Sequence, residues 1–353
     1  MDNIQILVFM DDVQSEENRE LILQQFDAID DKITYEMLQL SDVDLNSDTR
    51  VQGSDFILLF SDHLLLQITR YAKYLPPLVT IELPGHHSFF AEMTLRHMQS
   101  LLNRLINQQY WIDERSLLTT EIDGIIESGL NDFYLSSTES NTRIRYELQL
   151  DGVDLFEDND IANGILVSSP TGSTAMAMNL GGALIHPTSK VFQVQAEASR
   201  RNLTSHQIIP DTKILHISIQ DAILPLLIQV DGRRYQTRQT NFQLKKAGHV
   251  IKLIRVEKPE SGIQTKLDQK SRFEGIASLT SSSKFIFHVL QQQDRALKIQ
   301  EIVGITQITN LKTIRSALKL LQEKGYILRK ENWEDMREYL YYVSDPDLDR
   351  FYG

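Results

Sequence analysis

The residues with the clearest chemical potential lie in one stretch, Asn163 to Pro187, which reads NGILVSSPTGSTAMAMNLGGALIHP. Its apolar start predicts a strand, and Gly172 then permits a tight turn that a side chain would resist. The hydroxyls of Thr171, Ser173 and Thr174, beside free N–H groups at a helix start, favour an anion-binding rim. The small residues that follow leave room for a flat ring. The stretch therefore suits a nucleotide or dinucleotide, and an ordinary strand–turn–helix corner is the alternative.

The whole string resembles the NAD-binding signature of NAD kinases, DGLxxSTPTGSTAYxxxxGGxxxHP. The matching positions are Gly164, Ser168, Pro170, Thr171, Gly172, Ser173, Thr174, Ala175, Gly181, Gly182, His186 and Pro187. The resemblance extends over roughly residues 4–256. It implies a multi-domain α/β and β fold, in which a doubly wound α/β domain precedes a β-sandwich domain. It also implies a homo-oligomer, a dimer or a tetramer.

The resemblance suggests which residues hold the ligand. The string GLND at 129–132 resembles the family's ALNE/ALND motif, in which an amide and a carboxylate hold ribose hydroxyls and the adenine edge. Asp231 and the glycine after it resemble a late acidic turn of the family, although a hairpin turn explains them equally well. Two positions depart from the family: Asn163 replaces an aspartate and Met176 replaces a tyrosine. The predicted dinucleotide-binding residues are Asn131, Asp132, Asn163, Thr171, Thr174, Ala175, Met176 and Asp231.

A second loop departs further from the family. The residues FSDHL, 60–64, stand where NAD kinases have GGDGT, whose glycines let the backbone approach the phosphates of ATP. Asp62 keeps the place of the catalytic aspartate, but all the glycines are gone, so the sequence predicts loss of kinase activity. The next loop, GHHSFFAEM at 85–93, resembles the family's GxLGFxxE turn. We interpret His86 and His87 there as ordinary loop residues, and we predict no metal site.

Composition limits the class of protein. Of 353 residues, 41% are hydrophobic and 24% are charged, which is typical of a globular, soluble chain. We find no apolar run long enough for a membrane span and no basic signal peptide, and the chain has no cysteine, so we expect a cytoplasmic protein. A net charge of -12 argues against a chain-wide nucleic-acid surface, but not against a local basic helix.

Hydrophobic patterning predicts the elements that position these motifs. Alternating strands and helices predict an α/β domain over 1–110, a β-rich NAD-binding domain over 111–257 and a polar linker over 258–280. The predicted strands of the first domain are Ile4–Phe9, Phe56–Phe60 and Leu78–Leu83. The predicted helices are Ser15–Phe26, Leu64–Tyr74 and Phe90–Ile106.

The last part of the chain, residues 281–353, predicts three helices and a β-hairpin, an order that resembles the winged helix-turn-helix of bacterial transcription regulators. The helices are expected over Lys284–Gln292, Leu297–Val303 and Leu311–Lys324, and the strands over Tyr326–Lys330 and Glu338–Val343. The third helix carries a basic stripe and would enter the major groove of DNA. The predicted DNA contacts are Thr309, Asn310, Lys312, Thr313, Arg315, Ser316 and Lys319. A protein-interaction domain is the alternative.

Taken together, these features predict a nucleotide-sensing transcription regulator without kinase activity. It would bind NAD, NADP or a related adenine dinucleotide, and ligand occupancy would change DNA binding. The first alternative is an active NAD kinase, which would also need ATP and Mg²⁺. The second alternative is a non-catalytic scaffold whose winged domain binds protein.

Overall fold

The computed structural model of the chain describes residues 3–10, 16–27, 32–71, 74–83, 88–139, 142–156, 159–200, 206–256, 279–291, 295–331 and 338–343. They fall into two compact units. The first joins Met1–Glu82 to Phe90–Ile263, and the second joins Leu83–Phe89 to Gln264–Gly353. Most of the predicted linker lies outside the described residues, as do His86 and His87. The predicted domain boundaries stay a prediction.

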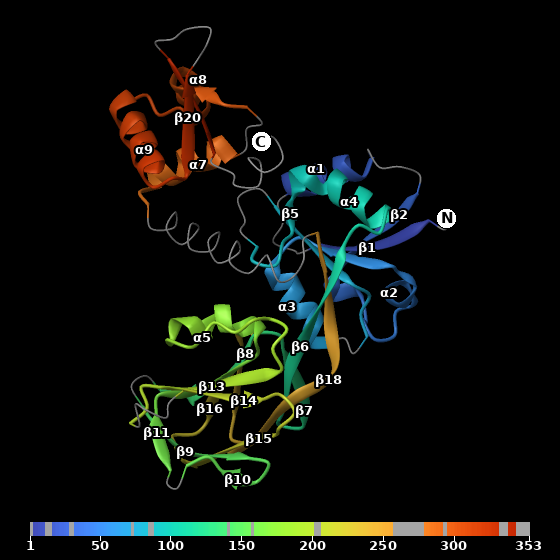
Figure 1. Cartoon of the computed structure of the whole chain (residues 1–353), viewed down its shortest axis with the longest axis vertical. Helices are drawn as coiled ribbons and strands as arrows, with labels where there is room; N and C mark the ends of the chain where they lie inside the picture. The colour runs from blue at the N-terminus through green and yellow to red at the C-terminus, as the bar shows by residue number, and fades with distance from the viewer. Residues whose placement is uncertain are drawn as a thin grey trace. The chain divides into compact units, whose positions relative to one another are not determined.

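The N-terminal part of the first unit is built on parallel strands in the order β2-β1-β3-β4. The strands are β1 (Ile4–Met10), β2 (Ile33–Gln39), β3 (Phe56–Leu59) and β4 (Leu78–Glu82), and the helices are α1 (Glu16–Asp27), α2 (Thr49–Gly53), α3 (Asp62–Tyr71) and α4 (Met98–Ile106). Figure 1 shows α1 and α4 on one side of these strands and α3 on the other. Strand β3 is wholly apolar because both of its faces are covered. Ligands of such sheets bind beyond the carboxyl ends of the strands.

The structure confirms the predicted strands β1, β3 and β4 and the predicted helices α1 and α3. The prediction missed β2, an edge strand that is only half-buried and therefore lacks a continuous apolar run. The predicted helix over 90–106 is wrong in its first half, where β5 (Met93–Thr94) and a 3₁₀ turn precede α4. The chain stays extended there because the Glu92 N–H donates to the Thr80 carbonyl at 3.1 Å.

The C-terminal part of the first unit contains a six-stranded sheet in the order β14-β13-β12-β8-β16-β17. Its strands are β8 (Asp132–Ser137), β12 (Gly164–Ser168), β13 (Val191–Glu197), β14 (His206–Pro210), β16 (Leu226–Val230) and β17 (Arg233–Thr237). A second sheet faces it, and one apolar core lies between the two. The described strands of the second sheet here are β6 (Trp111–Ile122), β7 (Ile125–Gly129), β9 (Ile144–Leu150), β10 (Val153–Asp154), β11 (Asp160–Ala162), β15 (Leu215–Asp221) and β18 (Asn241–Arg255).

Strand β18 joins the two parts of the first unit into one sheet. It pairs antiparallel with β6 and, at Leu253, parallel with Leu78 of β4. The second sheet is therefore continuous with the parallel strands at the N-terminus. Residues on β6 and β18 consequently lie where the two parts meet.

The second unit has the element order α7, β19, α8, α9, β20, β21 around its own apolar core. The elements are α7 (Ser281–Gln291), β19 (Leu297–Lys298), α8 (Ile299–Thr306), α9 (Leu311–Glu323), β20 (Ile327–Glu331) and β21 (Tyr339–Val343). The three strands form a sheet in the order β19-β21-β20. The predicted helix over 297–303 is wrong at both ends. Its first two residues form β19, and α8 continues past Gly304. The helix ends instead at Thr306, and its C-cap, Gln307, has a left-handed φ of 54°.

None of the helices among the described residues is long and apolar enough to cross a membrane.

Asn310 begins α9 by capping it. Its side-chain oxygen accepts hydrogen bonds from Lys312 N (3.0 Å) and Thr313 N (3.4 Å), and among the contacts of the described residues Thr309 has no such capping bond. We expect Asn310→Ala to destabilise the second unit by about 1 kcal/mol, because two N–H groups lose their acceptor. Hydrogen exchange of the first turn of α9, measured on the full chain, should accelerate. Thr309→Ala is the matched control, and equal acceleration in both variants would contradict the capping role.

Candidate functional site

The site is organised around the turn that carries Asn131 and Asp132. Asp231, at the end of β16, turns its carboxylate onto this turn. The carboxylate accepts hydrogen bonds from Leu130 N at 2.7 Å, Asn131 N at 2.8 Å and Asp132 N at 3.1 Å. In return, Asp231 N donates to the Asp132 carbonyl at 3.0 Å. Asp231 was predicted to bind the ligand, but its carboxylate is occupied by hydrogen bonds from backbone N–H groups. It therefore fixes the shape of the turn.

The stretch after β12 packs directly against the same turn. Ser169 N donates to the Asn131 carbonyl at 2.9 Å, and the Ser169 hydroxyl donates to the Leu130 carbonyl. Gly172 lies so close that a Cβ at this position would stand 2.0 Å from the Asn131 carbonyl oxygen. Gly172 is thus required for a close approach of two backbones, while its φ is not in the left-handed region.

The hydroxyls of the predicted anion-binding rim are buried, and their role toward a ligand stays a prediction. Thr171, Ser173 and Thr174 are all at most 5% exposed. The Ser173 hydroxyl donates to the Pro170 carbonyl at 2.7 Å, and the Thr174 hydroxyl donates to the Thr171 carbonyl at 3.2 Å. These hydroxyls hold the turn together because a buried hydroxyl needs a partner. The Thr171 hydroxyl differs, since it accepts a hydrogen bond from Arg115 Nη1 at 3.3 Å.

Two neighbouring carboxylates set the electrostatics of the turn. Burial, together with the charge of Asp231, raises the pKa of Asp132 to about 7, against a bond from the Met176 N–H that works to lower it. Burial likewise raises the pKa of Asp231, although three backbone N–H groups and Arg233 oppose this. Near neutral pH such a carboxyl group is present in both forms. The ionised form accepts a hydrogen bond from a ribose hydroxyl, and the protonated form donates one to it.

The structure brings most of the predicted dinucleotide-binding residues together. Ala175 and Met176 are half-buried beside the Asp132 turn, and Met176 packs against a small cluster that includes Tyr134. Asn163 is the exception. Ser168 pairs with Asp132 across the sheet, whereas Asn163 precedes the opposite end of β12, roughly 16 Å away along the strand. The role of Asn163 stays a prediction.

Asp62 begins α3 at the carboxyl edge of the parallel strands. The Ser61 hydroxyl accepts a hydrogen bond from Leu64 N at 3.1 Å and so caps the helix. Asp62 Oδ1 accepts a hydrogen bond from Phe90 N at 3.2 Å, which orients the carboxylate. The exposed ring of His63 contacts Gln67 at 2.7 Å.

A cavity of about 440 Å³ opens beside α3. It lies past the ends of β1 and β2, where an open α/β sheet binds its ligands. Leucine and valine side chains form part of its wall, and Asp44, Gln67, Arg70 and Arg233 contribute polar groups. Arg233 also ties α3 to the β-rich part, because it donates to the Leu66 carbonyl at 3.0 Å and to the Ser128 carbonyl at 2.8 Å.

Sequence reasoning missed Arg115, Arg255 and Arg233. Arg115 and Arg255 each stand alone in a strand, and Arg233 begins β17 beside Arg234; no spacing in the sequence connects them to the signature. Only strand pairing could have found Arg115 and Arg255, since β6 and β18 lie next to each other where the two parts of the unit meet. Within the described residues, no group of three or more His, Cys, Asp or Glu could hold a metal ion.

Comparison with known proteins points to one family. Residues 130–256 match the family described as ATP-NAD kinase C-terminal domain. An NAD kinase of Clostridium botulinum (strain ATCC 19397 / Type A) is 24% identical over 234 residues, which are 64% of this chain and 82% of the relative. An NAD kinase of Koribacter versatilis is 27% identical over 208 residues, 57% of this chain and 72% of the relative.

Two solved structures share the fold. An NAD kinase from Archaeoglobus fulgidus in complex with ATP has a TM-score of 0.59 and 16% identity, covering 75% of this chain and 98% of that chain. A yeast NADH kinase complexed with NADH has a TM-score of 0.65 and 15% identity, and the match covers 79% of this chain and 90% of that chain. The chain is thus related to the NAD kinases through residues 130–256 and shares their mixed α/β fold.

These findings correct the interpretation of the sequence. The expected transcription regulator without kinase activity is contradicted, because the relatives are named NAD kinase and the similar structures are NAD and NADH kinases. The findings favour the alternative of an active NAD kinase. Twelve positions of the signature stretch match the family, whereas the loss of glycines is confined to the loop at 60–64.

Gly172→Ala should disrupt the packing of the signature turn. The added Cβ would meet backbone atoms of Asn131 at 2.0 and 2.5 Å, which cannot rotate away. We expect a loss of roughly 2–4 kcal/mol in the free energy of unfolding, measured by denaturant titration. Gly53→Ala is the matched control, because a Cβ there would meet nothing within 4 Å. Equal stability of the two variants would contradict the close approach.

Asp132 should make stability depend on pH. Its pKa is about 7 in the folded chain against 3.8 ordinarily, so between these values only the folded state keeps the proton. The free energy of unfolding should therefore fall as pH rises from 4 to 8, on the order of 2–4 kcal/mol more than in Asp132→Asn. Urea titrations across this range would measure it. Asp221→Asn, at an exposed position, serves as the control, and parallel curves for all three proteins would contradict the shift.

Proposed function

We propose that this protein is an NAD kinase, which transfers the terminal phosphoryl group of ATP to a ribose hydroxyl of NAD or NADH. The observation that carries the proposal is the Asn131–Asp132 turn, locked by Asp231 and by Gly172 within the residues that match the NAD kinase family. Such a rigid turn, with a buried carboxyl group beside half-buried small residues, suits a flat base and a ribose.

The dinucleotide would lie against Asn131, Asp132, Thr174, Ala175 and Met176. Asp132 in its ionised form accepts ribose O–H groups, and the amide of Asn131 can pair with a base edge. Met176 offers a flexible apolar surface in place of an aromatic ring. Thr171 reaches the ligand through a hydroxyl that Arg115 already holds. NADP, the product, would occupy the same residues.

Asp62 is the proposed base. It would take the proton of the attacking ribose hydroxyl while the new oxygen–phosphorus bond forms and the bond between the γ-phosphorus and the leaving ADP oxygen breaks. The bond from Phe90 N holds one carboxylate oxygen in place. Ser61 and His63 stand where the family has glycines, so here the phosphates would meet the capped first turn of α3.

The cavity beside α3 is the proposed site of the donor nucleotide. Its volume of about 440 Å³ is in the range of nucleotide-sized pockets. Its apolar wall suits a base, and Gln67 and Asp44 can pair with base or ribose edges. Mg²⁺ is usually bound through substrate phosphates, so it would arrive with ATP and neutralise charge during the transfer.

The direct test incubates the purified full chain with NAD or NADH, ATP and Mg²⁺ and measures NADP or NADPH by mass spectrometry. We expect product from the wild type and a loss of at least 100-fold in kcat for Asp62→Asn, because the base is removed. Asp221→Asn, an exposed position distant in sequence, is the matched control and should keep full activity. No product from a wild-type chain that binds NAD in calorimetry would overturn the proposed function.

We also propose that the second unit is a winged helix-turn-helix. The order of its helices and its three-stranded sheet supports this assignment. Of the seven residues predicted to contact DNA, Thr313 is half-buried and the other six are exposed. The side-chain oxygen of Asn310 is occupied by the cap of α9, and Lys319 contacts Glu323 at 3.7 Å. Contact with DNA, the oligomer and the cytoplasmic location stay predictions.

A further inference from the structure

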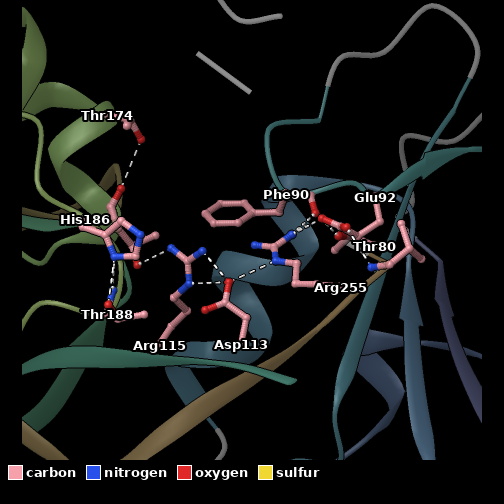
Figure 2. Close-up of polar contacts among 11 residues, drawn as sticks. Thr80, Phe90, Glu92, Asp113, Arg115, Thr174, His186, Thr188 and Arg255 are labelled. Atoms are coloured by element: carbon pink, nitrogen blue, oxygen red, sulfur yellow. Dashed lines mark hydrogen bonds and ion pairs between the residues drawn. The ribbon is translucent and has the colours of Figure 1, made fainter. Parts of the chain in front are cut away.

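A chain of buried charged side chains, drawn in Figure 2, lies between the signature turn and Phe90 in the first unit. Its members are Asp113 and Arg115 on β6, Arg255 on β18, and Glu92. Asp113 is 2% exposed, Arg115 7% and Arg255 5%. The Glu92 side chain is 6% exposed. Two arginines thus pair with two carboxylates away from water. A buried charge is costly unless it is paired, so each of these groups depends on its partners to stay ionised.

At one end, the chain reaches the dinucleotide turn. Arg115 Nε donates to Asp113 Oδ2 at 2.9 Å, Nη2 donates to the same oxygen, and Nη1 donates to the Thr171 hydroxyl at 3.3 Å. Burial raises the pKa of Asp113, but its bonds and charge contacts with Arg115 and Arg255 outweigh this and keep that pKa below its usual value. Asp113 therefore stays ionised and holds the guanidinium plane of Arg115 in one orientation.

At the other end, the chain reaches the proposed base. Arg255 Nε donates to the same oxygen of Asp113 at 3.0 Å, and its Nη1 donates to the Phe90 carbonyl at 3.0 Å and to Glu92 at 2.5 Å. The N–H of the same residue, Phe90, donates to Asp62 at 3.2 Å. The contacts therefore run without a gap from Thr171 through Arg115, Asp113, Arg255 and Phe90 to Asp62.

Stability alone does not account for this arrangement. Replacing a buried ion-pair network by apolar residues is often neutral or stabilising, because the charges lose their hydration. A purely structural pair also has no need to direct one guanidinium donor at a residue of the ligand-binding turn. What a planar, fixed guanidinium provides is a defined direction for each N–H group.

That direction determines how the Thr171 hydroxyl can act. Because its oxygen accepts a hydrogen bond from Arg115, the hydroxyl is left to donate its own hydrogen. Among the contacts of the described residues, the only bond of this hydroxyl is the one from Arg115. A ribose or phosphate oxygen of the dinucleotide is an acceptor of the matching kind.

We propose that Arg115 is a positioning residue for the dinucleotide. It sets the Thr171 hydroxyl as a donor to an oxygen of the ligand, and through the shared Asp113 it keeps this donor in register with Asp62. The inference rests on the proposed function, since it assumes a dinucleotide at the Asn131–Asp132 turn. It assigns no bond-making step to Arg115 itself.

The test compares Arg115→Met, Arg115→Lys and Thr171→Val in the full chain. We expect Arg115→Met and Thr171→Val each to weaken NAD binding by ~10-fold in calorimetry and to raise the KM for NAD equally, while the KM for ATP changes less than about twofold. Arg115→Lys should recover part of the loss, since it keeps a donor without the fork. Arg50→Met, in an exposed ion pair with Glu36, is the matched control and should behave as the wild type.

The double variant Arg115→Met with Thr171→Val separates positioning from general damage. If Arg115 acts through the Thr171 hydroxyl, the double variant should bind NAD no more weakly than either single variant. Additive losses, or equal rises in the KM for NAD and for ATP, would overturn the proposal. Should Arg115→Met not fold, Arg115→Lys combined with Thr171→Val gives the same comparison.

The outcomes also distinguish this proposal from the function on which it rests. If the wild type binds NAD, loses affinity in Arg115→Met and forms no NADP, only the kinase assignment fails. If NADP forms and Arg115→Met binds NAD like the wild type, only the positioning role fails. If the wild type does not bind NAD at all, both are overturned.

Discussion

The carboxylate of Asp231 is the constraint on which the rest of the site depends. It accepts hydrogen bonds from three consecutive backbone N–H groups and thereby fixes the turn that carries Asn131 and Asp132. The signature stretch can then pack its backbone onto that turn at Gly172, with no room for a side chain. The same arrangement buries Asp132 beside a second acid, and this burial, together with the charge of Asp231, raises the pKa of Asp132.

A second constraint comes from the way the sheet is built. Strand β18 pairs with β6 and with β4, so the two parts of the first unit share one continuous sheet. Charged residues at this junction are buried by the strands on either side of them. The proposed phosphoryl transfer would need donor and acceptor held in line, and a shared sheet with buried ion pairs is a suitable support for that geometry.

The sequence was informative where local chemistry decides structure and poor where distant strands decide it. The strands β1, β3 and β4 were predictable because their apolar runs are buried on both faces. The half-buried edge strand β2 and the extended start before α4 were not, because pairing and the contacts of Glu92 determine them. Asp231 was predicted as a ligand residue from its turn, but its backbone role depends on a contact about 100 residues away. No motif or spacing in the sequence indicated that Arg115 and Arg255 belong to the site.

The glycine-free loop at 60–64 shows why a motif and its function must be weighed by mechanism. Glycines matter where backbone approaches phosphate, but a capped helix start also presents N–H groups and a positive dipole end to an anion. Here Ser61 caps α3, and Asp62 remains at the first position with its carboxylate held by Phe90. Under the proposed function, the chain would keep the carboxylate that takes the proton and would differ from the family only in the surface that contacts the donor phosphates. The missing glycines therefore predict altered contacts with the donor phosphates. They do not by themselves predict that phosphoryl transfer is lost.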